Sequence, residues 1–193
     1  MGEKWMKITV LLSVLFLPLS FGKSSSKKMN NEIATLAGGC FWGVEELSRG
    51  MKGVVETAVG YTGGNTDKPV YETVKTGKTG HAEAVQITFD PKKTTYEEIL
   101  LTFFRLHDPT TPNRQGNDIG TQYRSAIFFH SPEQKATAER VKIRVENSKK
   151  WKSPLTTEIV PATMFFRAED YHQKYLEKNK GGYTCHYFRD FTF

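Results

Sequence analysis

The sequence contains few cysteines and lacks the motifs of several common protein classes. Its 193 residues include two cysteines, which is too few for a disulfide-rich scaffold. No CxxC pair occurs, and no cysteine and histidine residues follow the spacing of zinc sites, so no metal site is expected. The glycine-rich motifs GxxxxGKS, GxxxxGKT and GxGxxG are also missing, which excludes the usual phosphate-binding loops.

The chain has no strong excess of one charge. Lysine and arginine number 27 against 21 aspartate and glutamate residues, which gives a net charge of +6. The basic residues are spread along the chain and are not clustered with aromatic ones, which indicates a solvated surface and no nucleic-acid partner. Hydrophobic residues make up 38% of the chain, enough for one packed domain with a tail.

The N-terminal apolar stretch, residues 8–21, is shorter than the roughly 20 residues that a membrane-spanning helix needs. It follows a basic start and precedes the small residue Gly22, a layout that predicts a secretory signal peptide over residues 1–22. Polar residues 23–31 then form a flexible leader. We therefore expect export to the periplasm or cell envelope, with retention as a membrane anchor as the alternative.

Residues 32–193 alternate between strand and helix patterns and are predicted to form one catalytic domain of the α+β class. Strands are predicted at 32–36, 54–61, 81–89, 123–129 and 156–160. Helices are predicted at 40–50, from Thr94 with Glu97 closing a capping box, from Pro132 after Ser131, and over 170–178. The order β-α-β-β-α-β, with an additional helix and strand and a loosely structured C-terminal arm, matches a ferredoxin-like split βαβ core in a two-layer α/β sandwich. The long loops at 62–80 and 108–122 are of a length that usually has a binding or catalytic role.

Cys40 is the first candidate for chemistry. It follows a pair of glycines and opens a predicted helix, where free backbone N–H groups and the helix dipole stabilise a thiolate. Phe41 and Trp42 follow directly and offer an aromatic pocket. The alternatives are a buried small hydrophobic residue or one half of a structural disulfide with Cys185.

Glu83 is the second candidate. Strand alternation places it on the same face as Val85, Ile87 and Phe89, where its carboxyl group loses contact with water. Desolvation raises the pKa of a carboxyl group, and a neutral carboxylic acid can donate a proton to a substrate oxygen. The alternative is a solvated group at the end of the strand.

Three further candidates lie in or beside the two long loops. The hydroxyl groups of Tyr71 and Tyr123 can hydrogen-bond a polar substrate oxygen, although ordinary packing is the alternative for each tyrosine. The carboxylate of Asp118 can accept a hydrogen bond from a substrate donor.

Cys185 lies on the glycine-rich C-terminal arm, and a mobile second thiol suits a resolving cysteine that attacks an oxidised partner.

Several long motifs resemble those of peptide methionine sulfoxide reductases of the A type. They are GCFWG at 39–43, GYTGG at 60–64, GHAEAV at 80–85, GNDIGTQYRS at 116–125, TEI at 157–159 and AEDYHQ at 168–173. The resemblance extends from residue 32 to residue 185. It implies an enzyme that reduces the S epimer of methionine sulfoxide, free or in proteins, to methionine as a repair of oxidative damage.

The resemblance also implies a role for each candidate. Cys40 would be the nucleophile that attacks the sulfoxide sulfur, and Glu83 would donate a proton to the sulfoxide oxygen with help from Tyr71 and Tyr123. Cys185 would resolve the resulting sulfenic acid into a disulfide. The predicted substrate-binding residues are Phe41 and Trp42 around the S-methyl group, Asp118 at the substrate backbone, Gly39 and His81.

A thioredoxin-like dithiol donor would then reduce the disulfide, and no bound cofactor or metal would be needed. We expect a monomer with no stable membrane association once the signal peptide is removed. Relatives often carry two C-terminal cysteines, whereas this chain has Cys185 alone, so one resolving step is expected.

Two other classes fit the sequence less well. A papain-like hydrolase has a histidine about 130–150 residues after its cysteine, as His172 and His186 are after Cys40. Those enzymes resemble one another in a glutamine just before the cysteine, and here the first glutamine is Gln86. A secreted binding domain with a structural Cys40–Cys185 bridge is the non-enzymatic alternative; its bridge would resist mild reductant.

Overall fold

The computed structural model describes residues 1–2 and 30–193. The predicted signal peptide beyond Gly2 and most of the predicted leader therefore lie outside the described residues. Within the described part, no helix combines the length and the apolar character that crossing a membrane requires.

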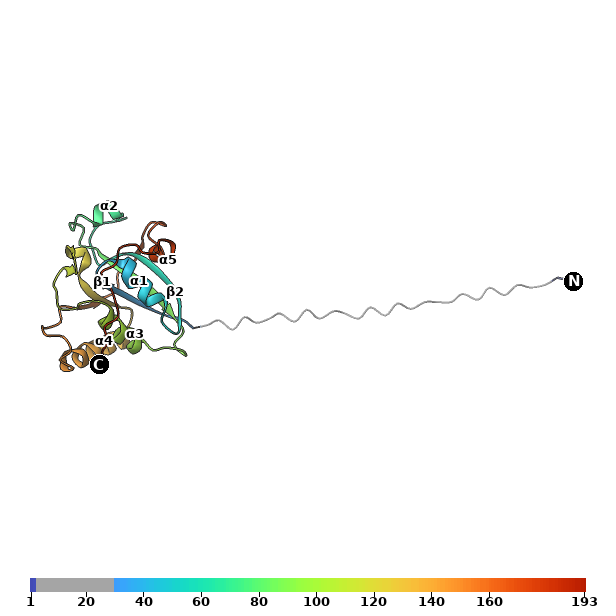
Figure 1. Cartoon of the computed structure of the whole chain (residues 1–193). Helices are drawn as coiled ribbons and strands as arrows, with labels where there is room; N and C mark the ends of the chain where they lie inside the picture. The colour runs from blue at the N-terminus through green and yellow to red at the C-terminus, as the bar shows by residue number, and fades with distance from the viewer. Residues whose placement is uncertain (3–29) are drawn as a thin grey trace.

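A six-stranded sheet forms the centre of the domain (Figure 1). Its strands are β1 (Glu32–Gly38), β2 (Val54–Thr62), β3 (Ala82–Phe89), β6 (Ser125–Phe129), β7 (Glu158–Pro161) and β8 (Phe166–Arg167). They lie in the order β7-β6-β1-β3-β2-β8, and every neighbouring pair is antiparallel except the parallel pair β6 and β7. The other elements are α1 (Phe41–Arg49), α2 (Tyr71–Val74), α3 (Tyr96–Leu106), β4 (Arg114–Gln115), β5 (Asp118–Ile119), a 3₁₀ helix (Thr121–Tyr123), α4 (Pro132–Asn147) and α5 (Tyr175–Lys178).

The ferredoxin-like prediction is confirmed by the strand order. The elements β1-α1-β2-β3-α3-β6 follow the split βαβ sequence, and their strands lie in the order β6-β1-β3-β2. The additional strands β7 and β8 extend the sheet at its two edges. The split arrangement places the C-terminal ends of β1 and β2 beside each other across β3, and the candidate residues follow or lie on these strands.

One apolar core joins the sheet to the helices α1, α3 and α4. Phe41 on α1, Phe103 on α3 and Val141 on α4 belong to the same buried cluster as Ile87 of β3. The apolar residues of α3 recur at helical spacing, so one stripe of the helix faces this core. A smaller cluster around Phe128 covers the other sheet face.

The helix start at α3 lies one residue later than predicted. The Thr95 hydroxyl accepts the Glu98 amide at 3.1 Å, and the Glu98 carboxylate accepts the Thr95 amide at 2.7 Å. The apolar stripe begins with Tyr96, which sets this register, so the capping pair is Thr95 and Glu98. The start of α4 is confirmed, because the Ser131 hydroxyl accepts the Gln134 amide at 3.2 Å.

Both long loops contain short elements that the sequence does not reveal. The first contains α2, and the second contains the β4–β5 hairpin and the 3₁₀ helix. Tyr123 lies in this 3₁₀ helix and not in the predicted strand. The last predicted helix is reduced to α5, which packs beside α1 (Figure 1).

The C-terminal arm, residues 181–193, contains no helix or strand, as predicted, but hydrogen bonds fix it to the domain. The Arg189 amide donates to the Arg105 carbonyl at 3.1 Å, and the Arg105 guanidinium donates to the Arg189 carbonyl at 3.1 Å. Arg144 of α4 donates to the Phe193 backbone oxygen at 2.7 Å. These bonds hold the arm against α3 and α4.

Candidate active site

Cys40 occupies the position directly before α1, where the chain leaves β1 and turns into the helix. Its side chain is 8% exposed. The turn requires a left-handed backbone at Gly39, whose φ is +100°, and a Cβ there would collide with the side chain of Gln115. The sequence prediction for the position of Cys40 is confirmed, and Gly39 serves to make this turn.

Glu83 lies on β3 and is 2% exposed. Its Oε2 accepts the Phe41 amide at 3.1 Å, so the acid is tied to the first turn of α1. Burial raises the pKa of Glu83 to about 8, against the lowering effect of the Phe41 hydrogen bond, and the negative charge of Asp118 raises it further. Glu83 is therefore a protonated acid near neutral pH, as the strand pattern predicted.

The Cys40 thiol differs from the prediction of a stabilised thiolate. Burial raises the pKa of Cys40 far above its ordinary value, and the negative charges of Glu83, Asp118 and Cys185 raise it further. The hydrogen bond from the Trp42 amide lowers the pKa but is outweighed. The helix N-terminus therefore does not ionise Cys40 in the free protein, and the resting residue is a thiol.

Tyr71 and Tyr123 belong to the same site. Burial raises the pKa of each phenol, and the negative charges of Glu83 and Cys40 raise both further, which places the four groups within electrostatic reach. Both hydroxyl groups consequently stay protonated and available as donors. Tyr71 begins α2, where its backbone amide donates to Glu169 Oε1 at 2.9 Å.

Asp118 and Cys185 meet on the outer side of the site. The Cys185 thiol donates to Asp118 Oδ2 at 3.3 Å, and the Tyr183 hydroxyl donates to Asp118 Oδ1 at 3.2 Å. Burial together with the Asp118 carboxylate raises the pKa of Cys185 to about 12. Cys40 and Cys185 are both free thiols, and ionisation of Cys185 would raise the pKa of Cys40 further. The arm therefore brings the second thiol to the first.

The two aromatic residues after Cys40 have different environments. Trp42 is half-buried, stacks on Tyr175 with ring centroids 3.7 Å apart, and donates its indole N–H to His172 Nδ1 at 3.0 Å. Phe41 is 1% exposed and packs between Tyr61 and His172 in the core. The ring of Trp42 is therefore fixed at the edge of the site. Phe41 lies in the core, and its contact with a substrate methyl group stays a prediction.

His81 is placed differently from the prediction. Its Nδ1 accepts the Gly64 amide at 3.2 Å, and its Nε2 lies 2.9 Å from the Thr66 carbonyl oxygen. Both ring nitrogens are thus used by the 62–70 loop, and none is left for a substrate. His81 fixes the loop that leads into α2 and so supports Tyr71.

The structure adds residues to the site that the sequence argument missed. Glu169 accepts the Tyr61 hydroxyl at 2.9 Å as well as the Tyr71 amide. Partial burial raises the pKa of Glu169, but these hydrogen bonds lower it by more, so the pKa lies below its ordinary value. His172 accepts the Trp42 indole. The AEDYHQ motif at 168–173 contains both Glu169 and His172, so the sequence signal for these two residues is this motif.

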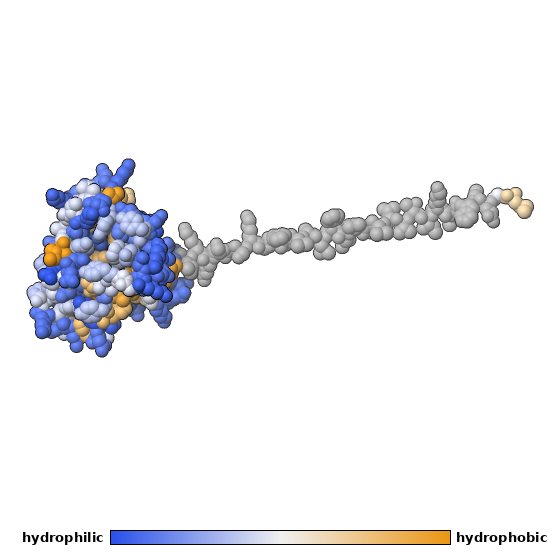
Figure 2. All heavy atoms as spheres, turned by 45° about the horizontal axis from the view of Figure 1, so that its top comes forward, coloured by the Kyte–Doolittle hydropathy of each residue, from blue (hydrophilic) through white to orange (hydrophobic). Residues whose placement is uncertain are grey.

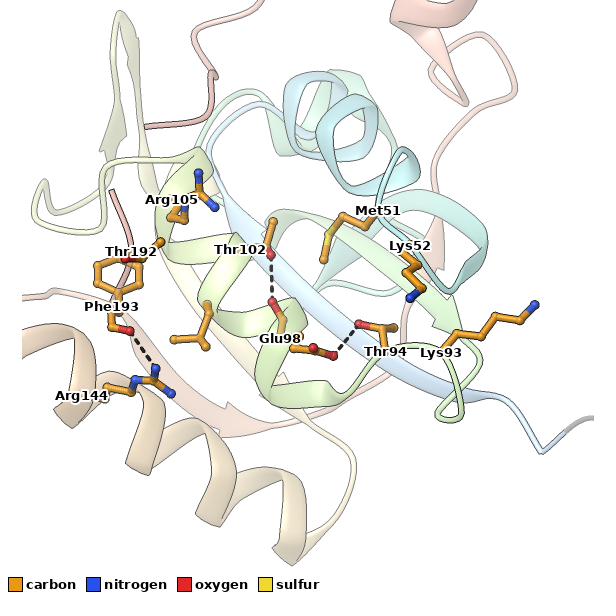
Figure 3. A pocket seen from close by; sticks show the side chains of 11 residues that line it. Met51, Lys52, Lys93, Thr94, Glu98, Thr102, Arg105, Arg144, Thr192 and Phe193 are labelled. Atoms are coloured by element: carbon orange, nitrogen blue, oxygen red, sulfur yellow. Dashed lines mark hydrogen bonds between the residues drawn. The ribbon is translucent and has the colours of Figure 1, made fainter. Parts of the chain in front are cut away.

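Several hollows of the described surface lie away from the candidate residues. Figure 3 shows one of about 510 Å³ beside α3, with Lys52, Lys93, Arg105 and Arg144 on its wall. None of the candidate residues lines it. The face in Figure 2 is mostly hydrophilic, with apolar side chains in separate spots. Among the described residues, no three His, Cys, Asp or Glu side chains are grouped so that they could hold a metal ion.

A thiol at a helix start, a buried neutral acid, two phenols and a second thiol together define a thiol-dependent redox enzyme. The family model for peptide methionine sulfoxide reductase matches residues 32–192. The chain therefore belongs to the peptide methionine sulfoxide reductase family.

Individual relatives agree with this assignment. The chain is 57% identical over 151 residues to peptide methionine sulfoxide reductase MsrA of Methanoculleus marisnigri, covering 78% of this chain and 92% of the relative. Mxr1 of Saccharomyces cerevisiae in reduced form is 42% identical, covers 83% of this chain and 93% of its own, and superimposes with a TM-score of 0.78. Mxr1 in complex with Trx2 gives 28% identity and a TM-score of 0.56 over 83% of this chain and 91% of its own.

Proposed function

We propose that this chain reduces the S epimer of methionine sulfoxide, free or in proteins, to methionine and is regenerated by a thioredoxin-like dithiol. The observation that carries the proposal is the hydrogen bond between the Phe41 amide and Glu83, which joins a protonated acid to the helix turn that follows Cys40. Membership of the family and the complex of the relative Mxr1 with Trx2 support the substrate and the donor class.

The first step transfers the sulfoxide oxygen to Cys40. Glu83 donates its proton to the oxygen, and the hydroxyl groups of Tyr71 and Tyr123 hydrogen-bond to it, which makes the sulfur electrophilic. The Cys40 sulfur attacks the sulfoxide sulfur, the sulfur–oxygen bond of the substrate breaks, and the hydroxyl group bonds to Cys40, so that methionine leaves and Cys40 is a sulfenic acid. The proton of the Cys40 thiol replaces the one that Glu83 gave up, so a resting thiol fits this step.

The second step restores the oxidised cysteine. Cys185 attacks the Cys40 sulfenic acid, water leaves, and a Cys40–Cys185 disulfide forms. A dithiol donor then reduces this disulfide. If the predicted signal peptide directs export, as we propose, the donor has to be an exported protein of the thioredoxin type, and the chain acts there as a monomer.

The test is a stereospecific assay on residues 23–193. The S and R sulfoxides of methionine are supplied separately with dithiothreitol, and methionine is measured beside a Cys40→Ser control. We expect reduction of the S epimer alone and its complete loss in the control. A folded, reduced protein that reduces neither epimer would contradict the proposal and favour the secreted binding domain.

A further inference from the structure

His186 directly follows Cys185 and is held against the start of α1. It is 6% exposed, and its Nε2 lies 2.7 Å from the Gly38 carbonyl oxygen. A carbonyl oxygen only accepts hydrogen bonds, so the Nε2 atom carries the proton of the neutral ring. The other nitrogen, Nδ1, then presents a lone pair and lies 3.6 Å from Cys185 Sγ.

The position of this imidazole is fixed by small residues and by its own backbone. A Cβ on Gly43 would collide with His186 Nδ1 and Thr184 Oγ1, and a Cβ on Gly39 would lie 3.1 Å from His186 Cε1. The His186 amide donates to Thr184 Oγ1 at 3.1 Å. The ring therefore fills a space that α1 leaves free, with its lone pair toward the thiol.

We propose that His186 is the general base that accepts the Cys185 thiol proton when Cys185 attacks the Cys40 sulfenic acid. This inference rests on the proposed function, whose second step it describes. In that step the Cys185 S–H bond and the Cys40 S–O bond break and the S–S bond forms. The thiol proton and the hydroxyl group leave together as one water, so no external oxidant or reductant is needed.

The Cys185 thiol needs a base because only its thiolate is a good nucleophile. Burial and the neighbouring Asp118 raise the pKa of Cys185 to about 12, so little thiolate exists at neutral pH. Asp118 also accepts the thiol hydrogen, at 3.3 Å, but a carboxylate is a weaker base than an imidazole. His186 Nδ1 is the second acceptor within reach of the thiol, at 3.6 Å, and an imidazole is ordinarily the stronger base of the two group types.

The surroundings of His186 keep it neutral. Burial lowers its pKa, the hydrogen bond to Gly38 and the negative charge of Asp118 raise it, and the positive charge of Arg189 lowers it. His107 also faces His186, and burial lowers the pKa of His107 to about 3, so it stays uncharged as well. The net effect is a pKa below the ordinary value, which leaves the Nδ1 lone pair free at neutral pH.

The experiment is a single turnover of the reduced chain with methionine S-sulfoxide and no reductant, stopped at intervals. Methionine reports the first step. Titration of the remaining thiols reports both steps, because the first consumes one of the two free thiols and the second consumes the other. The variant His186→Gln removes the base. The matched control is His130→Gln, since His130 is exposed and its imidazole bonds the Thr35 hydroxyl, away from both cysteines.

We expect His186→Gln to form methionine at the wild-type rate and to lose the second thiol about 10²-fold more slowly, the usual effect of a general base. The control should match wild type in both steps. Unchanged loss of the second thiol overturns the inference, as does an equal slowing of both steps, which would show that His186 shapes the Cys40 site. A wild-type chain that forms no methionine overturns the proposed function and this inference with it.

A second measurement needs no variant and so does not depend on the folding of His186→Gln. With a base of lowered pKa, the second step of the wild type should be nearly independent of pH between 6.5 and 8. Without a base, its rate should follow the thiolate fraction of Cys185 and rise about thirty-fold over that interval. Such a rise would refute the role of His186.

Discussion

The backbone amide of Phe41 donates a hydrogen bond of 3.1 Å to Oε2 of Glu83. The bond connects residues on α1 and β3, and it leaves Oε1 of the same carboxyl group to hold the acid proton. Because Cys40 is bonded covalently to Phe41, the nucleophile and the acid cannot move independently. The fold therefore sets their relative orientation before any substrate binds, which is the geometric condition for acid-assisted attack.

The acid role of Glu83 predicts a particular pH profile. In single turnovers of the wild type, methionine formation should be constant below pH 8 and fall above it as Glu83 loses its proton. Glu83→Gln should be slower by about 10²-fold or more below pH 8 and should lose this decline. The rate of methionine formation is measured in stopped single turnovers between pH 6 and 9.5. A Glu83→Gln variant with the wild-type rate and pH profile would contradict the acid role of Glu83.

The same carboxyl group also couples stability to pH. Burial raises the pKa of Glu83 from 4.5 to about 8 in the folded state, so the folded chain retains a proton that the unfolded chain releases. The unfolding free energy should therefore decrease between pH 4.5 and 8, by a few kcal/mol from this group. Between pH 5 and pH 8, urea denaturation should show a smaller decrease in the unfolding free energy for Glu83→Gln than for wild type. An equal decrease would contradict the raised pKa of Glu83 in the folded state.

Cys185→Ser separates the two halves of the cycle. The variant retains Cys40 and Glu83, so it should still form about one methionine per chain in a single turnover. With a thioredoxin-type donor it should not continue, because no intramolecular disulfide forms. Methionine per chain is measured with and without the donor, and cycling at the wild-type rate would show that Cys185 is not the resolving thiol.

Gly43→Ala tests the contact between α1 and the C-terminal arm. The added methyl group meets His186 and Thr184 and should cost about 1–3 kcal/mol of stability while slowing disulfide formation. Gly50→Ala is the matched control at the end of the same helix, where an added Cβ meets nothing within 4 Å. Thermal melting and loss of the second thiol distinguish the two variants; equal behaviour would mean that the arm does not pack on Gly43.

The order of strands and helices along the chain was predictable because each longer element leaves a pattern within a short segment. Alternation along 81–89 identified β3 and the buried Glu83, and the helical stripe identified α3. The N-cap of α3 was predicted one residue too early, at Thr94, because two neighbouring threonines precede the helix and the apolar stripe begins only after Thr95. Elements as short as α2 or β4 have no periodicity and were missed.

The arm and the state of Cys40 were not predictable in the same way. His186 bonds Gly38 across 148 residues of sequence, a contact with no local signal. The thiolate prediction for Cys40 considered the helix dipole, whose effect is about 1 kcal/mol, but burial among Glu83 and Asp118 shifts the pKa by more. The burial of a side chain depends on how the whole chain packs around it, so it cannot be predicted from a short sequence motif.

The anchoring of the arm has a consequence for electron transfer. Cys185 is held by two residues that follow it: the His186 imidazole is bonded to the Gly38 carbonyl at the end of β1, and the Arg189 amide is bonded to the Arg105 carbonyl on α3. A disulfide at this place is displayed by a rigid surface and not by a trailing peptide. The reductant has to bring its own sulfur to that surface, so the shapes of the two proteins, and not capture of a loose tail, determine which donors are accepted.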